Sequence, residues 1–162
     1  MFAAFVLAVV LADFTGYWKH RLFHLPGLWR FHAVHHSPRV VDWLSNERVH
    51  PVEGLATTAL QLGPLLALGF SPLAIAGAAA FRRLHSLYEH GNLRIAYGVG
   101  ERWLVSPHLH RWHHSSDPAA YHKNFANVFS LWDSLFGSFW APPVGDPPRW
   151  GWRRSRRGSG AN

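Results

Sequence analysis

The sequence predicts an all-α integral membrane protein, with long helices in the bilayer and a helical cap outside it. Three observations support this prediction. Residues 1–18 and 54–81 are almost free of charged side chains. The 13 histidines gather in spaced clusters flanked by aromatic residues. All 16 Lys and Arg lie outside the two apolar stretches, as expected when the connecting segments share one side of a membrane.

Composition limits the class of protein further. A chain of 162 residues fits one domain, and we expect a membrane domain over 1–140 followed by a disordered tail rich in Pro and Arg over 141–162. The absence of cysteine excludes disulfides, thiolate metal sites and iron–sulfur clusters. The net charge of +7 would suit nucleic acid or an anionic membrane. No nucleic-acid-binding motif is present, so we expect no nucleic-acid partner.

Residues 1–18 form the first predicted helix. At 1.5 Å per residue this helix is about 27 Å long, close to the thickness of the hydrocarbon core. A signal peptide is disfavoured, because no basic segment precedes the apolar run and no small-residue cleavage site follows it. Asp13 interrupts the run, and two positions for it stay open: facing protein or the site, or lying near the membrane interface.

Histidine boxes follow directly, over 20–36 (HRLFHLPGLWRFHAVHH) and 108–114 (HLHRWHH). Pro26-Gly27 predicts a turn inside the first stretch, and Ser37-Pro38 is expected to end its second helix. Residues at i, i+3 and i+4 share one face of a helix, so each box can aim several imidazoles at one point. Neutral imidazole binds iron, zinc and copper. The boxes therefore predict a His-rich metal site in the cap.

Residues 54–88 are predicted to form a helical hairpin. Gly69-Phe-Ser-Pro72 combines a helix stop with a cap and a helix start, which favours two short helices over one long span. An even number of crossings also returns the chain to the side where it began, so that His50 and His90 can reach one site. The distribution of Lys and Arg then places the His boxes and the C-terminus on the cytoplasmic side of a multi-pass protein.

With these motifs in place, the chain over roughly 13–139 resembles the fatty acid hydroxylase/sterol desaturase superfamily of membrane di-iron oxidoreductases. The resemblance rests on the segments DFTGYWKHRLFH (13–24), LWRFHAVHHS (28–37), RVHPVE (48–53), HGN (90–92), PHLHRWHHS (107–115), NF (124–125) and WDSLFG (132–137). It implies a cytosolic helical cap holding two metals. The implied ligands are His20, His24, His32, His35, His36, His90, His110, His113 and His114, with His50 matching a weaker element.

The resemblance also implies the chemistry. Two irons would use dioxygen and external electrons to hydroxylate or desaturate a C–H bond of a sterol, fatty acyl chain or related lipid. Electrons would come from a separate reductase, ferredoxin or small haem protein, since no haem, flavin or iron–sulfur motif is present. Zinc could occupy the site in purified protein, and a homo-oligomer is compatible with the sequence.

Five carboxylates are candidates to orient imidazole N–H groups, with an ordinary helix-end or surface role as the alternative for each: Asp13, Glu47, Glu53, Glu89 and Asp133. His85, His108 and His122 match no box and are expected beside the site or on the surface. The aromatic segment 123–140 is expected either on the membrane surface or packed beneath the histidines.

Two other functions stay open at this point. A zinc-dependent membrane hydrolase could use the same histidines, with Glu47 or Glu89 as general base. A truncated, non-catalytic metal-binding relative is the other alternative, because family members usually carry one or two more apolar segments upstream. The usual Asn-Phe-Gly also appears here as Asn124-Phe125-Ala126.

Overall fold

The computed structural model describes residues 1–147 and 151, and every regular element in that part of the chain is a helix. The all-α prediction is therefore confirmed. The long helices are α1 (Phe2–Phe23), α3 (Pro51–Ala67) and α4 (Pro72–Glu89), and the short ones are α2 (Pro26–His32), α5 (Pro107–His113) and α6 (Leu131–Leu135), with 3-10 turns η1 (Ser45–Glu47), η2 (Gly98–Arg102) and η3 (Pro118–Ala120). Most of the tail expected over 141–162 lies outside the described residues.

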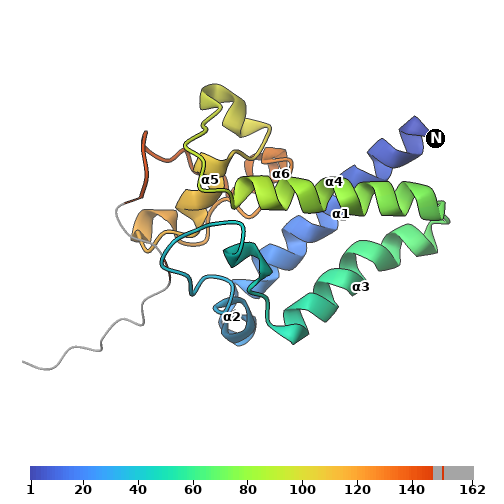
Figure 1. Ribbon diagram of the computed structural model, residues 1–162, viewed down its shortest axis with the longest axis horizontal. Helices are drawn as coiled ribbons and strands as arrows, with labels where there is room; N and C mark the ends of the chain where they lie inside the picture. The colour runs from blue at the N-terminus through green and yellow to red at the C-terminus, as the bar shows by residue number, and fades with distance from the viewer. Residues whose placement is uncertain (148–150, 152–162) are drawn as a thin grey trace, which may run out of the picture.

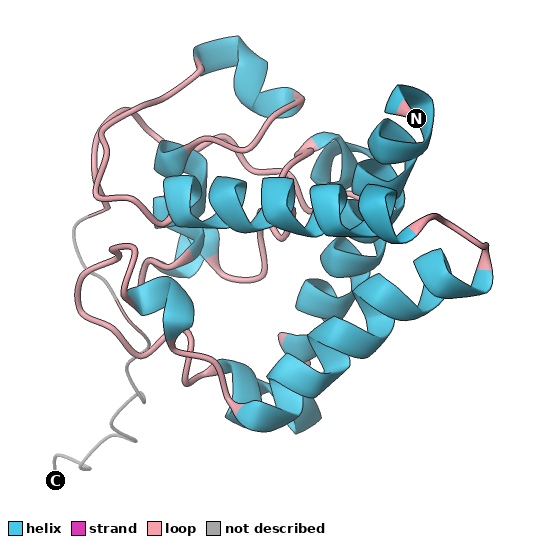
Figure 2. Cartoon of the chain, turned by 45° about the vertical axis from the view of Figure 1, so that its right-hand side comes forward, coloured by secondary structure: helices cyan, strands magenta, loops and turns pink. Residues whose placement is uncertain are grey.

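The molecule has two ends of different character (Figure 1). The long helices extend toward the end that holds the N-terminus and the α3–α4 turn, while the short helices and loops form the cap at the other end. Figure 2 shows the same division from a second direction. α1 packs against α3 and α4 through small side chains, among them Ala8, Ala12 and Ala78, which are at most 5% exposed. Small residues let these helix backbones approach closely.

α1 is longer than the predicted helix 1–18. No proline interrupts the chain before Pro26, so the helix continues to Phe23 and carries His20 on its last turn. At the other end of the bundle, α3 stops at Ala67 and Gly69 adopts a φ of +73°. The Ser71 hydroxyl then accepts a hydrogen bond from the Ala74 amide and caps α4, whose first residue is Pro72.

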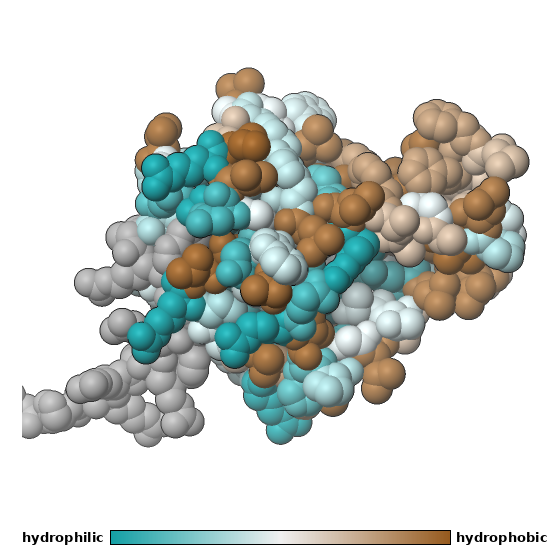
Figure 3. All heavy atoms as spheres, in the orientation of Figure 1, coloured by the Kyte–Doolittle hydropathy of each residue, from teal (hydrophilic) through white to brown (hydrophobic). Residues whose placement is uncertain are grey.

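Among the described helices, only α1 is long and apolar enough to cross a membrane by length and composition. α3 has 17 residues, and α4 carries Arg82 and Arg83. Apolar side chains are nevertheless exposed on the hairpin, including Leu55, Leu66, Leu68, Leu73 and Leu84. Figure 3 shows such residues gathering at the end of the molecule away from the cap. The multi-pass topology therefore stays a proposal.

The second box differs from its predicted helix. α2 ends at His32, and residues 33–36 form a turn in which the amides of His35 and His36 both donate to the His32 carbonyl, at 2.9 and 3.2 Å. The helix thus ends before Ser37-Pro38, because the turn satisfies these amides without a further helical turn. His36 thus keeps the i, i+4 hydrogen bond of a helix to His32, whereas the amide of His35 bonds over the tighter i, i+3 spacing.

Candidate metal centre

Nine histidines converge in two neighbouring groups within the cap. The five-histidine group comprises His20, His24, His32, His36 and His113, and the four-histidine group comprises His35, His90, His110 and His114. Within each group, one ring nitrogen from every member lies within 4.8 Å of those of the others. All nine were predicted from the sequence as ligand candidates. They come from the end of α1, from α2 and the turn after it, from the end of α4 and from α5.

Each H-x-x-H-H box contributes to both groups. His32 and His36 belong to the five-histidine group, whereas His35 between them belongs to the other. In the other box, His113 belongs to the five-histidine group and its neighbour His114 to the four-histidine group. The groups touch where the rings of His36 and His114 stack, with centroids 4.3 Å apart. The boxes therefore build one joint centre.

Ring nitrogens face one another at hydrogen-bonding distance. The Nε2 atoms of His35 and His90 are 3.2 Å apart, and Nε2 of His110 lies 3.0 Å from Nε2 of both His90 and His114. A neutral imidazole carries one proton, so a single Nε2 cannot satisfy two such neighbours. In the five-histidine group, buried Nε2 atoms of His20, His24 and His113 have no hydrogen-bond partner in the described residues. The donor set fits two metal ions held by nitrogen.

Backbone carbonyls fix the protonation of three of these rings. Nδ1 lies 2.7 Å from the Phe125 carbonyl in His20, 2.7 Å from the Lys123 carbonyl in His113 and 2.8 Å from the Ser86 carbonyl in His90. A carbonyl only accepts hydrogen bonds, so Nδ1 carries the proton and donates it. Each Nε2 then presents its lone pair to the centre of its group.

Two strained residues present two of these carbonyls. His122 and Asn124, on either side of Lys123, adopt φ values of 57° and 58°, a conformation that Asn tolerates better than most residues. The Asn124 side chain donates to the Trp140 carbonyl and accepts from the Trp140 amide, both at 2.9 Å. The orienting role of these carbonyls was not predicted, because every residue has a backbone carbonyl and its residue type does not show whether that carbonyl faces an imidazole. The Asn124-Phe125 pair is the sequence feature that could have indicated this loop.

Glu53 is the one of the five predicted carboxylates that lies at hydrogen-bonding distance from an imidazole. Its Oε1 accepts from Nδ1 of His32 at 2.8 Å and from Nζ of Lys19 at 2.9 Å. All three side chains are largely buried. Glu53 therefore orients His32, and Lys19 balances its charge.

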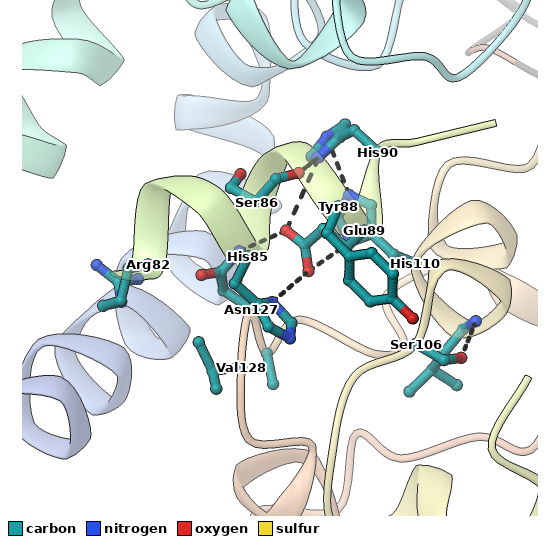
Figure 4. A network of polar contacts seen from close by, with 12 residues as sticks. Arg82, His85, Ser86, Tyr88, Glu89, His90, Ser106, His110, Asn127 and Val128 are labelled. Carbon is teal, nitrogen blue, oxygen red and sulfur yellow. Dashed lines mark hydrogen bonds and ion pairs between the residues drawn. The ribbon is translucent and has the colours of Figure 1, made fainter. Parts of the chain in front are cut away.

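Glu89 lies under the four-histidine group without such a bond (Figure 4). Its carboxylate oxygens are 3.8 Å from Nδ1 of His90 and 3.8 Å from Nδ1 of His110. The side-chain amide of Asn127 donates to the same carboxylate. Glu89 is thus close to the two imidazoles but does not orient them through a hydrogen bond. Asn127 was not singled out from the sequence.

The two predicted aspartates hold the loop and not an imidazole. Asp133 accepts from the amides of Phe125 and Ala126, at 2.7 and 2.9 Å. Asp13 faces protein, accepting from the Val128 amide at 3.1 Å and from the Trp132 indole at 3.0 Å. Both carboxylates are fully buried. Segment 123–140 is accordingly packed against α1 beneath the histidines.

The remaining predicted residues belong to neither group. Glu47 is exposed and pairs with Arg83. His50 caps α3, because its Nδ1 accepts from the Val52 amide at 3.1 Å. His108 contacts Glu101 at 3.1 Å. His85 and His122 also belong to neither group.

Electrostatics keep the grouped histidines neutral. Burial, reinforced by neighbouring imidazoles, holds the pKa values of His35, His36, His110 and His114 well below the usual range. Burial likewise lowers the pKa of His113 to about 3 and that of His90 to about 4. Neutral imidazole is the form that binds metal, so the folded cap keeps its ligands ready at neutral pH.

A sequence model of the fatty acid hydroxylase family matches residues 5–138. The chain belongs to the fatty acid hydroxylase family. Its relatives include ornithine lipid hydroxylase of Rhizobium tropici, 36% identical over 85% of this chain and 42% of the relative. Alkylglycerol monooxygenase of Homo sapiens is 33% identical over 78% of this chain and 28% of its own length. C-4 methylsterol oxidase of Schizosaccharomyces pombe is 31% identical over 77% and 43%.

This fatty acid hydroxylase family chain therefore spans less than half the length of these curated relatives. No solved structure matches it significantly. The names of these relatives describe hydroxylation, monooxygenation or oxidation of lipids.

Two cavities reach the centre of this family member. The larger, of about 480 Å³, lies between α1, α3 and α4 and has histidines of both groups in its wall, including His20 and His90. The smaller, of about 300 Å³, lies on the other side of the five-histidine group, beside Trp29 and Tyr121. The larger cavity thus connects the centre with the space between the long helices.

Proposed function

We propose that this chain is a membrane-bound di-iron oxidoreductase that hydroxylates or desaturates a C–H bond of a lipid. The convergence of nine neutral imidazoles in two adjacent groups, eight of them buried and that of His20 half-buried, carries the proposal. The five-histidine group would hold one iron and the four-histidine group the other. Bound iron would supply the activation of dioxygen, and electrons would come from a separate reductase, ferredoxin or small haem protein.

The chain's own residues hold and orient the ligands. In four of the rings, Nδ1 donates its proton away from the centre. The acceptors are the backbone carbonyls of Phe125, Lys123 and Ser86 and the carboxylate of Glu53. The larger cavity would admit the substrate from between the long helices and keep bulk water from the centre. Ornithine lipids, alkylglycerols and methylsterols, named for the relatives, support a lipid as the substrate class.

We further propose that residues 1–140 form one multi-pass membrane domain with its His boxes and C-terminus on the cytoplasmic side. The exposed leucines of the hairpin and the location of Lys and Arg support this topology. Because the chain has no cysteine, single cysteines can be introduced at the exposed positions Leu68, in the α3–α4 turn, and Val40, in the cap. In spheroplasts, an impermeant maleimide should label L68C before lysis and V40C only afterwards, and the reverse pattern would refute the topology.

Metal analysis tests the function. Full-length protein purified in detergent and loaded anaerobically with iron should bind two irons per chain. With a reductant, a redox protein and ¹⁸O₂, it should then oxidise lipids of a mixed extract, with label incorporated in the case of hydroxylation. Zinc that iron cannot displace would indicate the hydrolase instead. Folded protein with less than one metal per chain would indicate a non-catalytic relative.

A further inference from the structure

A buried arginine without hydrogen bonds lies in the larger cavity. Arg82, on α4, is only 8% exposed. Its buried Nε has no hydrogen-bond partner, and no hydrogen bond joins its guanidinium to another described residue. The side-chain amide of Gln61, across the cavity on α3, likewise makes no hydrogen bond to the described residues. A buried guanidinium whose N–H groups make no hydrogen bond is costly, so a ligand that accepts from them is indicated.

Gly16 on α1 makes room for both side chains. A Cβ at this position would lie 2.7 Å from Nη2 of Arg82 and 3.0 Å from Nε2 of Gln61. Three helices thus bring a glycine, an amide and a guanidinium to one point of the cavity. In Figure 4, Arg82 lies along α4 at a distance from His90 and His110, beside a neighbouring helix.

The charge of Arg82 is only partly compensated. Its nearest carboxylate is Asp13, at 3.6 Å between Nε and Oδ1, and that carboxylate already accepts from two backbone amides and an indole. The other cations in the cavity wall have close partners, since Lys19 pairs with Glu53 and Arg83 with Glu47. Among these three cations of the cavity wall, Arg82 is therefore the one whose N–H groups remain available to a ligand.

We propose that Arg82 and Gln61 bind an anionic oxygen group, a carboxylate or a phosphate, that belongs to the lipid substrate. The planar guanidinium matches such groups with two parallel hydrogen bonds. This inference rests on the proposed function, in which the cavity receives the substrate. Eight residues of helix separate Arg82 from His90, about 12 Å along the axis. The site would therefore fix the distance between the anionic group and the carbon presented to the metal centre.

Binding of lipids that share one tail and differ in their head tests the proposal. The full-length protein, in neutral maltoside micelles without oxygen or reductant, is equilibrated with labelled oleic acid or oleyl alcohol, corrected for partition into empty micelles. The wild type should prefer oleate by about tenfold or more. Because no turnover is needed, failure of the oxidation chemistry leaves this result readable.

Variants assign the preference to the site. R82Q and Q61L should reduce the preference for oleate to within about twofold, and R82K should retain part of it, because an ammonium keeps the charge without the planar fork. G16A should act like R82Q by displacing the guanidinium. G63A, on α3 with no atom within 4 Å of the added Cβ, is the matched control and should bind as the wild type does.

These measurements test both the existence of the anion site and the kind of anion that it binds. Equal binding of oleate and oleyl alcohol by the wild type would overturn the proposal, as would an unchanged preference in folded R82Q and G16A. Competition with dioleoyl phosphatidic acid distinguishes the two sources of the anion. Displacement of oleate by this lipid supports a site that takes phosphate headgroups, whereas its failure to compete supports a site selective for a carboxylate.

Discussion

The Nε2 atoms of His90 and His110 lie 3.0 Å apart, although these residues are on different helices and 20 positions apart in the sequence. Nδ1 of His90 carries the proton and donates a hydrogen bond to the Ser86 carbonyl, so Nε2 of the neutral ring has a free lone pair. The same Nε2 also faces Nε2 of His35 at 3.2 Å. Three ring nitrogens turned toward one another in this way are best satisfied by a shared cation.

Removing one member of this group should therefore remove one metal. In H110A the four-histidine group loses a ligand that the five-histidine group does not use, so metal content should fall by about one ion per chain. Elemental analysis of folded, iron-loaded protein measures this. H122N is the control, since Asn tolerates the φ of 57° and His122 belongs to neither group. Unchanged metal content in H110A would contradict the division into groups.

Glu53 should tune metal affinity without being a ligand. E53Q keeps the shape of the side chain but loses the charge that orients His32 and pairs with Lys19. Loss of such an orienting partner typically weakens metal binding by about 10- to 100-fold. Competition with a chelator gives the affinity. E47Q removes the charge of an exposed glutamate and should leave affinity unchanged. If both variants behave alike, the role assigned to Glu53 is wrong.

The loop that presents the Phe125 carbonyl should depend on Asp133. In D133N one amide or hydroxyl donor loses its acceptor, because the Asn side chain offers a single acceptor atom. The free energy of unfolding should fall by about 2 to 3 kcal/mol. Chemical denaturation measures this change, and D117N, at an exposed capping position where Asn serves equally well, should change it little. Equal stabilities of D133N and D117N would argue against the role of Asp133 in holding this loop.

Acid should destabilise the metal-free protein. The pKa of His113 lies at about 3 and that of His90 at about 4 in the folded state, against about 6.5 when unfolded. Between these values the unfolded chain binds more protons, so the free energy of unfolding decreases as pH falls below about 6.5. The slope is at most about 1.4 kcal/mol per pH unit for each histidine.

Thermal melts of chelator-treated protein at pH 7 and pH 5 measure this effect. The midpoint should be lower at pH 5, and bound metal should reduce the difference, because it holds the imidazoles neutral. A higher midpoint at pH 5 would show that the histidines are not buried as the fold requires.

The sequence was sufficient to find the nine grouped histidines, because their residue type and spacing are visible in it. Their division was not predictable. Helical spacing places His32, His35 and His36 on one face, but His32 and His36 belong to one group and His35 to the other. The same division occurs on α5, where His110 and His114 share one group and His113 joins the other, so contacts between boxes far apart in the sequence decide it.

Roles that depend on tertiary contacts were harder to predict. Glu53 and Asp133 were both candidates to orient an imidazole, yet only Glu53 contacts one. His50 was predicted as a weaker ligand candidate, but it caps α3. Proline is common at the first position of a helix, so Pro51 could have indicated that His50 precedes a helix. The long helices followed from apolar runs and turn residues, whereas their packing depends on small residues such as Gly16 whose neighbours lie far away in the sequence.

The sharing of each box between both groups has a consequence for biosynthesis. The five-histidine group needs residues from 20 to 113, and the four-histidine group needs residues from 35 to 114. A ribosome must therefore have made most of the cap before either group exists, and neither can be completed before the other is nearly complete. Metal cannot guide early steps of folding in such a chain. Metal held by these groups would instead enter a framework that is largely assembled, as a late step of maturation.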